Sequence, residues 1–174
     1  IGLVAQDAFG QLLERLDAAG AVASLAEACT IIRRLWTETE PFDVEGTHHR
    51  LTGAFGNPKP VQRPHPPILV GGRSTATLRV AAEHADVWNV PGGDLDDAVR
   101  RSALLDRLCA EVGREPAAIT RSIVLPVSYG RPDETRDAIR AAIDAGFPHV
   151  VLGLGAPYPD GVARWVADEL VTAT

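Results

Sequence analysis

The chain has 174 residues, of which 45% are hydrophobic and 23% charged, and its net charge is −6. This balance is typical of a soluble globular protein, and we expect residues 1–174 to form a single domain. The acidic balance disfavours nucleic acid and anionic membranes as partners. No apolar run reaches the roughly 18 residues that span a bilayer, and residues 1–10 do not match a signal peptide. We therefore expect a cytoplasmic protein, with both cysteines, Cys29 and Cys109, as reduced core residues.

The amino-terminal part of the chain is predicted to be helical. Residues 24–38 carry apolar side chains at helical spacing, and Ser24 and Glu27 match a capping box at the start of such a helix. Residues 9–19 have a similar spacing, and Gly20 is expected to end that earlier helix.

Residues 39–67 are predicted to form an insertion without helix. Residues 42–51 indicate a small hairpin that turns at Glu45-Gly46. Residues 57–67 contain five prolines in eleven positions, which excludes a helix and a central strand. We favour an ordered extended connection over a linker, because this segment leads directly into a predicted strand.

From Ile68 onward, strands and helices are predicted to alternate. Continuous apolar runs predict four strands that are buried on both faces, and right-handed crossovers between them give a parallel sheet covered by helices. In the predicted helix 94–112, Val99 is one of the residues expected to face inward. The predicted strands are residues 68–71, 86–90, 122–127 and 149–154, and the predicted helices are 75–84, 94–112, 132–146 and 159–171.

Two architectures accommodate four consecutive βα units: an open doubly wound sheet and a barrel. A (β/α)8 barrel requires eight units, so either the sheet is open or half of a barrel is missing. The chain has no methionine, even at position 1, which favours the missing half. We interpret the fold class as α/β, the carboxy-terminal half of a TIM-type barrel with a preceding helix and a small hairpin insertion. Because a half-barrel exposes strand edges and an apolar face, we expect a homo-oligomer or a missing amino-terminal half to cover them.

The strongest local motif is the segment 68–75, Ile-Leu-Val-Gly-Gly-Arg-Ser-Thr. Here a predicted strand ends at Val70, Gly71 and Gly72, and a helix opens just after Arg73. Glycines allow close approach of a ligand, free N–H groups at a helix start attract phosphate, and Arg73 adds a fixed positive charge to the candidate phosphate site. The alternative interpretation is a tight turn that needs glycine for its backbone conformation alone. A Rossmann site is disfavoured, because the full G-x-G-x-x-G pattern is absent.

A second group of candidate residues lies at the end of the next predicted strand, where ligands bind in parallel α/β folds. Asn89, Val90 and Pro91 fall at this level, together with Trp88. An indole or an amide there can pack against a planar ring or hydrogen-bond to it. The alternative interpretation places Trp88 in the core and gives Asn89 the role of capping a turn.

The sequence predicts no metal site. His48 and His49 are adjacent on a predicted hairpin, and neighbouring strand residues point to opposite faces. No other spacing of His, Cys and carboxylate residues resembles a metal site, and no nucleophile elbow is visible.

The most specific feature of residues 31–89 is a proline-rich passage into a strand that ends Val-Gly-Gly, followed by Ala-Asp-x-Trp-Asn. The motifs in this part of the chain are Ile31-Ile-Arg-Arg-Leu-Trp36, Phe42-x-x-Glu-Gly-x-x-x-Arg-Leu51, Asn57-Pro-Lys-Pro-Val-Gln62, Pro64-His-Pro-Pro-Ile-Leu-Val-Gly-Gly72 and Ala81-Ala-Glu-His-Ala-Asp-Val-Trp-Asn89. Together they resemble the luciferase-like monooxygenase family, in its branch that uses the deazaflavin coenzyme F420.

This resemblance implies a (β/α)8 barrel whose last four strands are those predicted here. It also implies that Val70, Gly71 and Gly72 hold the coenzyme phosphate, and that the end of the Trp88-Asn89 strand lines the same channel. Relatives often have further glycines where this chain has Arg73 and Ser74. The family's proton donor comes from the first four strands, so no catalytic residue is assigned in this chain.

The function implied by the resemblance is that of an oxidoreductase. It transfers a hydride between coenzyme F420 and a small organic substrate. One alternative is an FMN-dependent monooxygenase that uses molecular oxygen. An alternative of another class is a non-catalytic half-barrel that serves only in folding or assembly.

Overall fold

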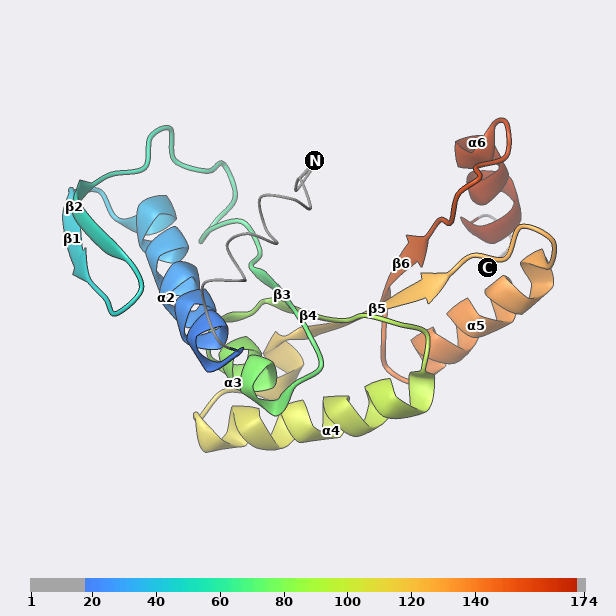
Figure 1. Cartoon of the computed structure of the whole chain (residues 1–174), viewed down its shortest axis with the longest axis horizontal. Helices are drawn as coiled ribbons and strands as arrows, with labels where there is room; N and C mark the ends of the chain where they lie inside the picture. The colour runs from blue at the N-terminus through green and yellow to red at the C-terminus, as the bar shows by residue number, and fades with distance from the viewer. Residues whose placement is uncertain (1–17, 172–174) are drawn as a thin grey trace. The chain divides into compact units, whose positions relative to one another are not determined.

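The computed structural model describes residues 18–171 (Figure 1). The chain divides into two compact units, residues 1–68 and 69–174. The single-domain organisation stays a prediction. Within residues 18–171, no helix combines the length and the apolar character that a membrane crossing requires.

The first unit contains helix α2 (Ala18–Thr37) and the hairpin of β1 (Phe42–Glu45) and β2 (Arg50–Ala54). The hairpin is antiparallel and turns after Glu45, which confirms its prediction. The helix begins earlier than predicted: Gly20 lies inside α2 and does not end a helix. The part of the earlier predicted helix that covers residues 9–17 lies outside the described residues.

The predicted capping box is wrong, because Ser24 and Glu27 are both interior residues of α2 and bind the hairpin instead. The Glu27 carboxylate accepts the backbone N–H groups of Thr47, His48 and His49 at 2.9–3.0 Å. Burial raises the pKa of Glu27, but these backbone donors bring it below its usual value. A Cβ at Gly46 would collide with the same carboxylate, so the hairpin turn requires glycine there.

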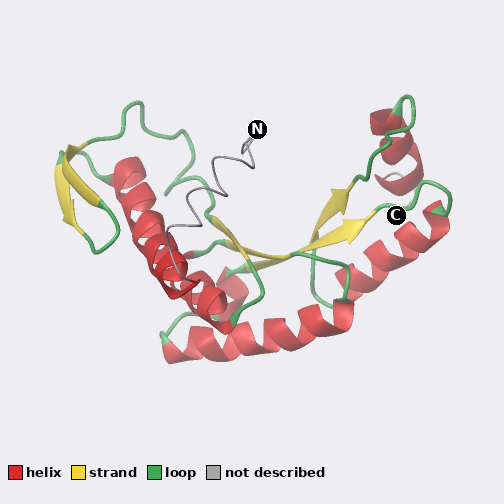
Figure 2. Ribbon diagram, viewed as in Figure 1, coloured by secondary structure: helices red, strands yellow, loops and turns green. Residues whose placement is uncertain are grey.

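The second unit is a parallel four-stranded sheet with helices between successive strands (Figure 2). The strand order is β3-β4-β5-β6, so each strand pairs with its neighbour in sequence. The bounds of the elements are β3 Leu69–Gly71, α3 Thr75–His84, β4 Val87–Val90, α4 Leu95–Glu111, η1 Pro116–Ala118, β5 Thr120–Pro126, α5 Pro132–Asp144, β6 His149–Gly153, α6 Val162–Val166 and η2 Ala167–Val171.

This sequential order, without a reversal, distinguishes the sheet from a doubly wound one. Right-handed crossovers between neighbouring parallel strands place the intervening helices on one side, and α3, α4 and α5 lie together on one side of the sheet (Figure 2). Val70, Trp88 and Ile123 point to the helical side and are buried. The architecture is therefore the one expected for consecutive units of a barrel wall.

The prediction that all four strands are buried on both faces is wrong. Only β5 is buried on successive positions, whereas burial alternates along β3 and β4. Leu69, on the face opposite Val70, is 52% exposed, and Val151 of β6 is also exposed. The physical reason is that the helices between the strands cover only one side of this sheet.

Most helix ends in this unit follow their local signals. The Asp94 side chain caps α4, and Pro132 opens α5 at its first turn. Gly113, with φ +69°, ends α4 in a Schellman motif in which Arg114 N–H donates to the carbonyl of Cys109 at 2.9 Å.

Two helical predictions in this unit need correction. Val99 is 43% exposed rather than inward, because its position on α4 lies outside the stripe that contacts the sheet. The last helix begins at Val162 instead of residue 159, since Gly161 precedes it in a left-handed conformation at φ +68°. It then continues as the π-helical segment η2.

The core of the second unit gathers around Trp88 and Phe147, which are fully buried with ring centroids 6.3 Å apart. Cys109 is buried in the same unit and Cys29 is buried in the first unit, and both are free thiols, as expected. Burial raises the pKa of each thiol above its usual value.

Candidate functional site

The turn between β3 and α3 is built around Gly72. Its φ is +147°, a conformation that residues with a Cβ rarely adopt, and a Cβ would lie 2.7 Å from the Thr77 Cγ2 atom. Ser74 caps α3, and its Oγ accepts the Thr77 N–H at 3.1 Å. Glycine is therefore obligatory for the turn itself, and the sequence analysis did not identify the Ser74 cap.

The peptide groups of Gly72 are held by the next strand. The Gly72 N–H donates to the Asn89 carbonyl at 3.0 Å, and the Trp88 indole Nε1–H donates to the Gly72 carbonyl at 3.0 Å. Trp88 is fully buried, so the interpretation of Trp88 as a core residue is confirmed. Trp88 also fixes the turn, and the Gly72 N–H is already bonded within the protein.

Donors for a ligand remain just beyond Gly72. Within residues 18–171, the backbone N–H groups of Arg73, Ser74, Thr75 and Ala76 have no hydrogen-bond acceptor. The last two belong to the first turn of α3, where N–H groups have no partner inside the helix and carry the positive end of the helix dipole. This arrangement has the chemistry of an anion site.

The β4 residues predicted for the site occupy different environments. Asn89 shares the sheet face with Gly71, and its Nδ2 donates to the Ser122 Oγ at 2.7 Å, while His149 Nδ1 lies 2.8 Å from the same oxygen. Asn89 thus joins a polar row across three strands and does not cap a turn with its side chain. Val90 is buried on the helical side, whereas Pro91 is exposed in the loop that follows.

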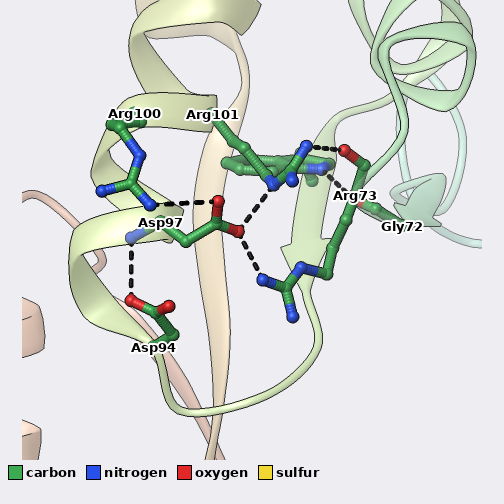
Figure 3. A network of polar contacts seen from close by, with 7 residues as sticks. Gly72, Arg73, Asp94, Asp97, Arg100 and Arg101 are labelled. Atoms are coloured by element: carbon green, nitrogen blue, oxygen red, sulfur yellow. Dashed lines mark hydrogen bonds and ion pairs between the residues drawn. The ribbon is translucent and has the colours of Figure 1, made fainter.

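Arg73 reaches from the turn toward the start of α4 (Figure 3). Its Nη2 lies 2.5 Å from the Asp97 Oδ2, and a Cβ at Gly92 would lie 3.5 Å from its Nη1. The structure therefore brings together the two loops that the sequence predicted for the site. The Arg73 side chain is 41% exposed, so it is partly open to solvent.

Asp97 lies at the centre of an arginine cluster, which we define as Arg73, Arg100 and Arg101 around this carboxylate (Figure 3). Arg101 Nε donates to Oδ2 at 2.6 Å, and Arg100 Nη2 lies 3.4 Å from Oδ1. Arg101 also donates to the backbone carbonyl of Arg73. The hydrogen bonds from Arg101, and then those from Arg73, lower the pKa of Asp97 to about 2.

The cluster carries an excess of positive charge, because three guanidinium groups surround the single carboxylate of Asp97. Sequence analysis missed Asp97 and Arg101. Their i,i+4 spacing on a predicted helix was a usable signal for the ion pair between them, but not for their contact with Arg73.

A cavity of about 300 Å³ lies beside the carboxyl end of β5. It has an apolar floor from the strand and from α5, and a charged rim. A Cβ at Gly93 would lie 3.1 Å from Pro126 Cδ, so the loop after β4 closely approaches its wall. Its lining was not predicted from the sequence and consists of Gly93, Leu125, Pro126, Val127, Ser128, Arg131, Glu134, Thr135 and Ala138.

In the part of the chain that the structure describes, no three or more His, Cys, Asp or Glu side chains gather closely enough to hold a metal ion.

Known proteins of similar sequence include enzymes and uncharacterised proteins. The chain is 28% identical over 142 residues to the FMNH2-dependent dimethylsulfone monooxygenase of Pseudomonas putida, a match that covers 77% of this chain and 38% of that protein. It is 33% identical over 135 residues to an uncharacterised protein of Mycobacterium tuberculosis, covering 78% of this chain and 44% of that protein. The chain thus spans less than half the length of these curated relatives.

Solved structures show the same fold. An F420-dependent secondary alcohol dehydrogenase, in complex with an F420-acetone adduct, superposes with a TM-score of 0.73 at 14% identity, over 86% of this chain and 61% of that one. The coenzyme F420-dependent tetrahydromethanopterin reductase of Methanopyrus kandleri gives the same TM-score at 14% identity, over 88% and 64%.

These neighbours are luciferase-like TIM-barrel proteins, of which this chain is a partial, smaller version, and this confirms the predicted fold class. The family match extends over residues 2–167. Members of this family are F420- or flavin-dependent oxidoreductases and monooxygenases. The chain belongs to the luciferase-like monooxygenase family.

Proposed function

We propose that the chain binds the phosphate of a deazaflavin coenzyme at the turn between β3 and α3. The whole protein then transfers a hydride between coenzyme F420 and a small organic substrate. The F420-dependent enzymes among the structural neighbours support the choice of coenzyme.

The observation that carries this proposal is the convergence of three anion-binding features at one turn. Backbone N–H groups from Arg73 to Ala76 lack acceptors within residues 18–171, and the last two lie at the positive end of α3. The Arg73 guanidinium has one edge on Asp97 and is otherwise partly open to solvent. The absence of a Cβ at Gly72 keeps the turn in the conformation that presents these groups.

The neighbouring residues supply shape rather than charge. Trp88 and the Asn89 backbone hold Gly72 in place, and the Asn89 amide is oriented by Ser122 on the sheet face shared with Gly71. We propose that Val90 contributes through its backbone, because its side chain is buried on the opposite face, and that Pro91 borders the site in the following loop. The Val70 side chain is buried like that of Val90, so we propose that Val70 anchors the turn from the core.

The coenzyme, when bound, supplies the hydride chemistry. The residues of this chain bind and orient it: the backbone donors and the helix dipole hold its phosphate, and Arg73 adds a charge-assisted hydrogen bond. We propose no proton-transferring residue in this chain.

A second candidate is an FMN-dependent monooxygenase that uses molecular oxygen. It is favoured by the similarity to the FMNH2-dependent dimethylsulfone monooxygenase, at 28% identity. The turn has the same role in both candidates, since both coenzymes carry a phosphate.

The test is a fluorescence titration of the full-length protein with F420 and, separately, with FMN. Gly72→Val and Arg73→Ala are each expected to weaken coenzyme binding roughly 10- to 100-fold, since a charge-assisted hydrogen bond contributes about 1.5–3 kcal/mol and 1.4 kcal/mol corresponds to tenfold. Gly113→Val is the matched control, because Gly113 also has a positive φ but lies in open space at the other end of α4.

Each outcome of the titration separates the candidates. Unchanged affinity in Gly72→Val places the phosphate elsewhere and removes the site. Tight binding of FMN but not of F420 keeps the site and selects the monooxygenase candidate. Binding of neither coenzyme overturns the proposal and favours the non-catalytic half-barrel.

A further inference from the structure

We propose that Asp97 is a positioning residue, which orients the Arg73 guanidinium toward the coenzyme phosphate. This inference rests on the proposed phosphate site and adds a residue to it that the sequence motifs do not include. Asp97 lies on α4, 24 residues beyond Arg73, and acts on the site only through that arginine.

The geometry separates the role of Asp97 from that of a surface ion pair. Its side chain is only 13% exposed, and its Oδ2 accepts from both Arg73 and Arg101. Arg101 in turn donates to the Arg73 carbonyl. One carboxylate and one guanidinium of α4 therefore hold both the side chain and the backbone of Arg73.

Asp97 leaves the Nε and Nη1 donors of Arg73 without an acceptor within residues 18–171. Asp97 contacts Nη2, whereas Nη1 lies next to Gly92 in the loop after β4. A guanidinium has five N–H donors in a rigid plane, so fixing one nitrogen determines the direction of the others. Without Asp97, a long flexible side chain must lose its rotamer freedom when the phosphate binds.

Orientation and charge make opposite predictions for Asp97. If Arg73 acts only through its charge, then removing the nearby negative charge makes the site more positive and strengthens phosphate binding. If Asp97 acts by orientation, then its removal weakens binding. Since Arg73 is partly exposed, water and salt screen the through-space effect, and we expect orientation to dominate.

The experiment compares Asp97→Asn with wild type in the full-length protein, using ligands with and without the phosphate. FMN is paired with riboflavin, and F420 with its phosphate-free deazaflavin core. Asp97→Asn is expected to weaken binding of the phosphate-bearing ligand roughly tenfold, about the loss of one charge-assisted hydrogen bond, and to leave binding of the phosphate-free ligand unchanged. Asp97→Glu, which keeps the carboxylate, is expected to restore part of the difference.

The matched control is Glu111→Gln. Glu111 is also on α4 and pairs with an arginine of the preceding helix, Arg79, at 2.7 Å, so the same charge is removed at the far end of the helix. This control is expected to leave both affinities unchanged. Tighter binding or unchanged binding of the phosphate-bearing ligand in Asp97→Asn overturns the inference, and so does an equal loss for both ligands. If Arg73→Ala and Gly72→Val also spare the phosphate-bearing ligand, the proposed phosphate site itself fails.

Discussion

Two arginines of the second unit each pair with an aspartate of α4, but they do so at opposite ends of the sheet. Arg73 follows the carboxyl end of β3 and contacts Asp97, whereas Arg121 lies near the amino end of β5 and contacts Asp106. The side chain of Arg121 is 9% exposed, against 41% for Arg73.

The two arginines differ in how many of their guanidinium N–H groups donate hydrogen bonds within the protein. Arg121 donates to the Ser102 hydroxyl, to Asp106 and to the carbonyls of Pro116 and Ile119, so its donors are nearly all satisfied. Within residues 18–171, Asp97 is the one acceptor of the Arg73 side chain. In barrel folds, function gathers at the carboxyl ends of strands and stability at the amino ends. The phosphate site that we propose at Arg73 and the satisfied donors of Arg121 match that division.

The largest effect on stability is expected for Arg121→Met. The substitution leaves the Ile119 carbonyl without its donor, which costs about 1–3 kcal/mol, and it also removes the hydrogen bonds to Ser102, Asp106 and Pro116. We therefore expect a loss of about 3–5 kcal/mol. Arg73→Met is expected to change the free energy of unfolding by about 1 kcal/mol or less, because Asp97 keeps Arg101 as a partner and the Arg73 side chain is partly exposed.

Urea unfolding at neutral pH, monitored by circular dichroism, measures both values. Equal losses for the two variants would contradict the division of roles between the two ends of the sheet.

A smaller contrast in the free energy of unfolding is expected between alanine substitutions at two glycines with positive φ. Gly72 lies near the carboxyl ends of the strands, and Gly113 lies near their amino ends. Alanine at Gly72 faces both backbone strain and a contact with Thr77 at 2.7 Å, and we expect a cost of about 2–4 kcal/mol. Alanine at Gly113 meets no atom within 4 Å, and we expect about 1 kcal/mol from its left-handed backbone alone.

The same unfolding measurement tests this contrast, and the double variant Gly72→Ala with Thr77→Ser sharpens it. Removing the Thr77 methyl group is expected to recover part of the cost. If it recovers none, backbone strain accounts for the whole effect and the steric explanation is wrong.

The smallest effect is expected in acid. The pKa of Asp97 is lowered to about 2 in the folded protein, chiefly by Arg101 and then by Arg73, so the unfolded chain takes up this proton first. The stability that Asp97 contributes is therefore complete above about pH 4 and is lost as the pH falls toward about 2. The difference in unfolding free energy between wild type and Asp97→Asn should shrink over this interval, whereas a difference that stays constant with pH would show that Asp97 does not titrate in the way described.

Local signals predicted much of this fold because several elements have strong start and stop residues. Asp94, Pro132 and Gly113 lie at the helix ends where their chemistry predicts, and the helix over residues 75–84 has the predicted bounds. The start of α2 was mispredicted because Ser24 and Glu27 match a cap in sequence but bind the hairpin 20 to 25 residues away. Spacing along the chain cannot distinguish these two partners.

The candidate site was predictable in its position but not in its contacts. The glycines of the turn and the strand end at Asn89 follow from the rule that ligands bind at the carboxyl ends of parallel strands. The engagement of the Gly72 N–H by Asn89, and of Arg73 by Asp97, depends on strand register and on the packing of α4, which a single sequence does not encode locally.

The hairpin of the first unit is attached to helix α2 through its backbone N–H groups. Glu27 binds the N–H groups of Thr47, His48 and His49, and these donors exist for every amino acid except proline. The tip of the hairpin can therefore accept varied side chains at Thr47 and His48 without losing its attachment, provided that Glu27 and Gly46 are kept. This makes the tip a natural location for sequence libraries, in which new surface chemistry is introduced on an unchanged backbone.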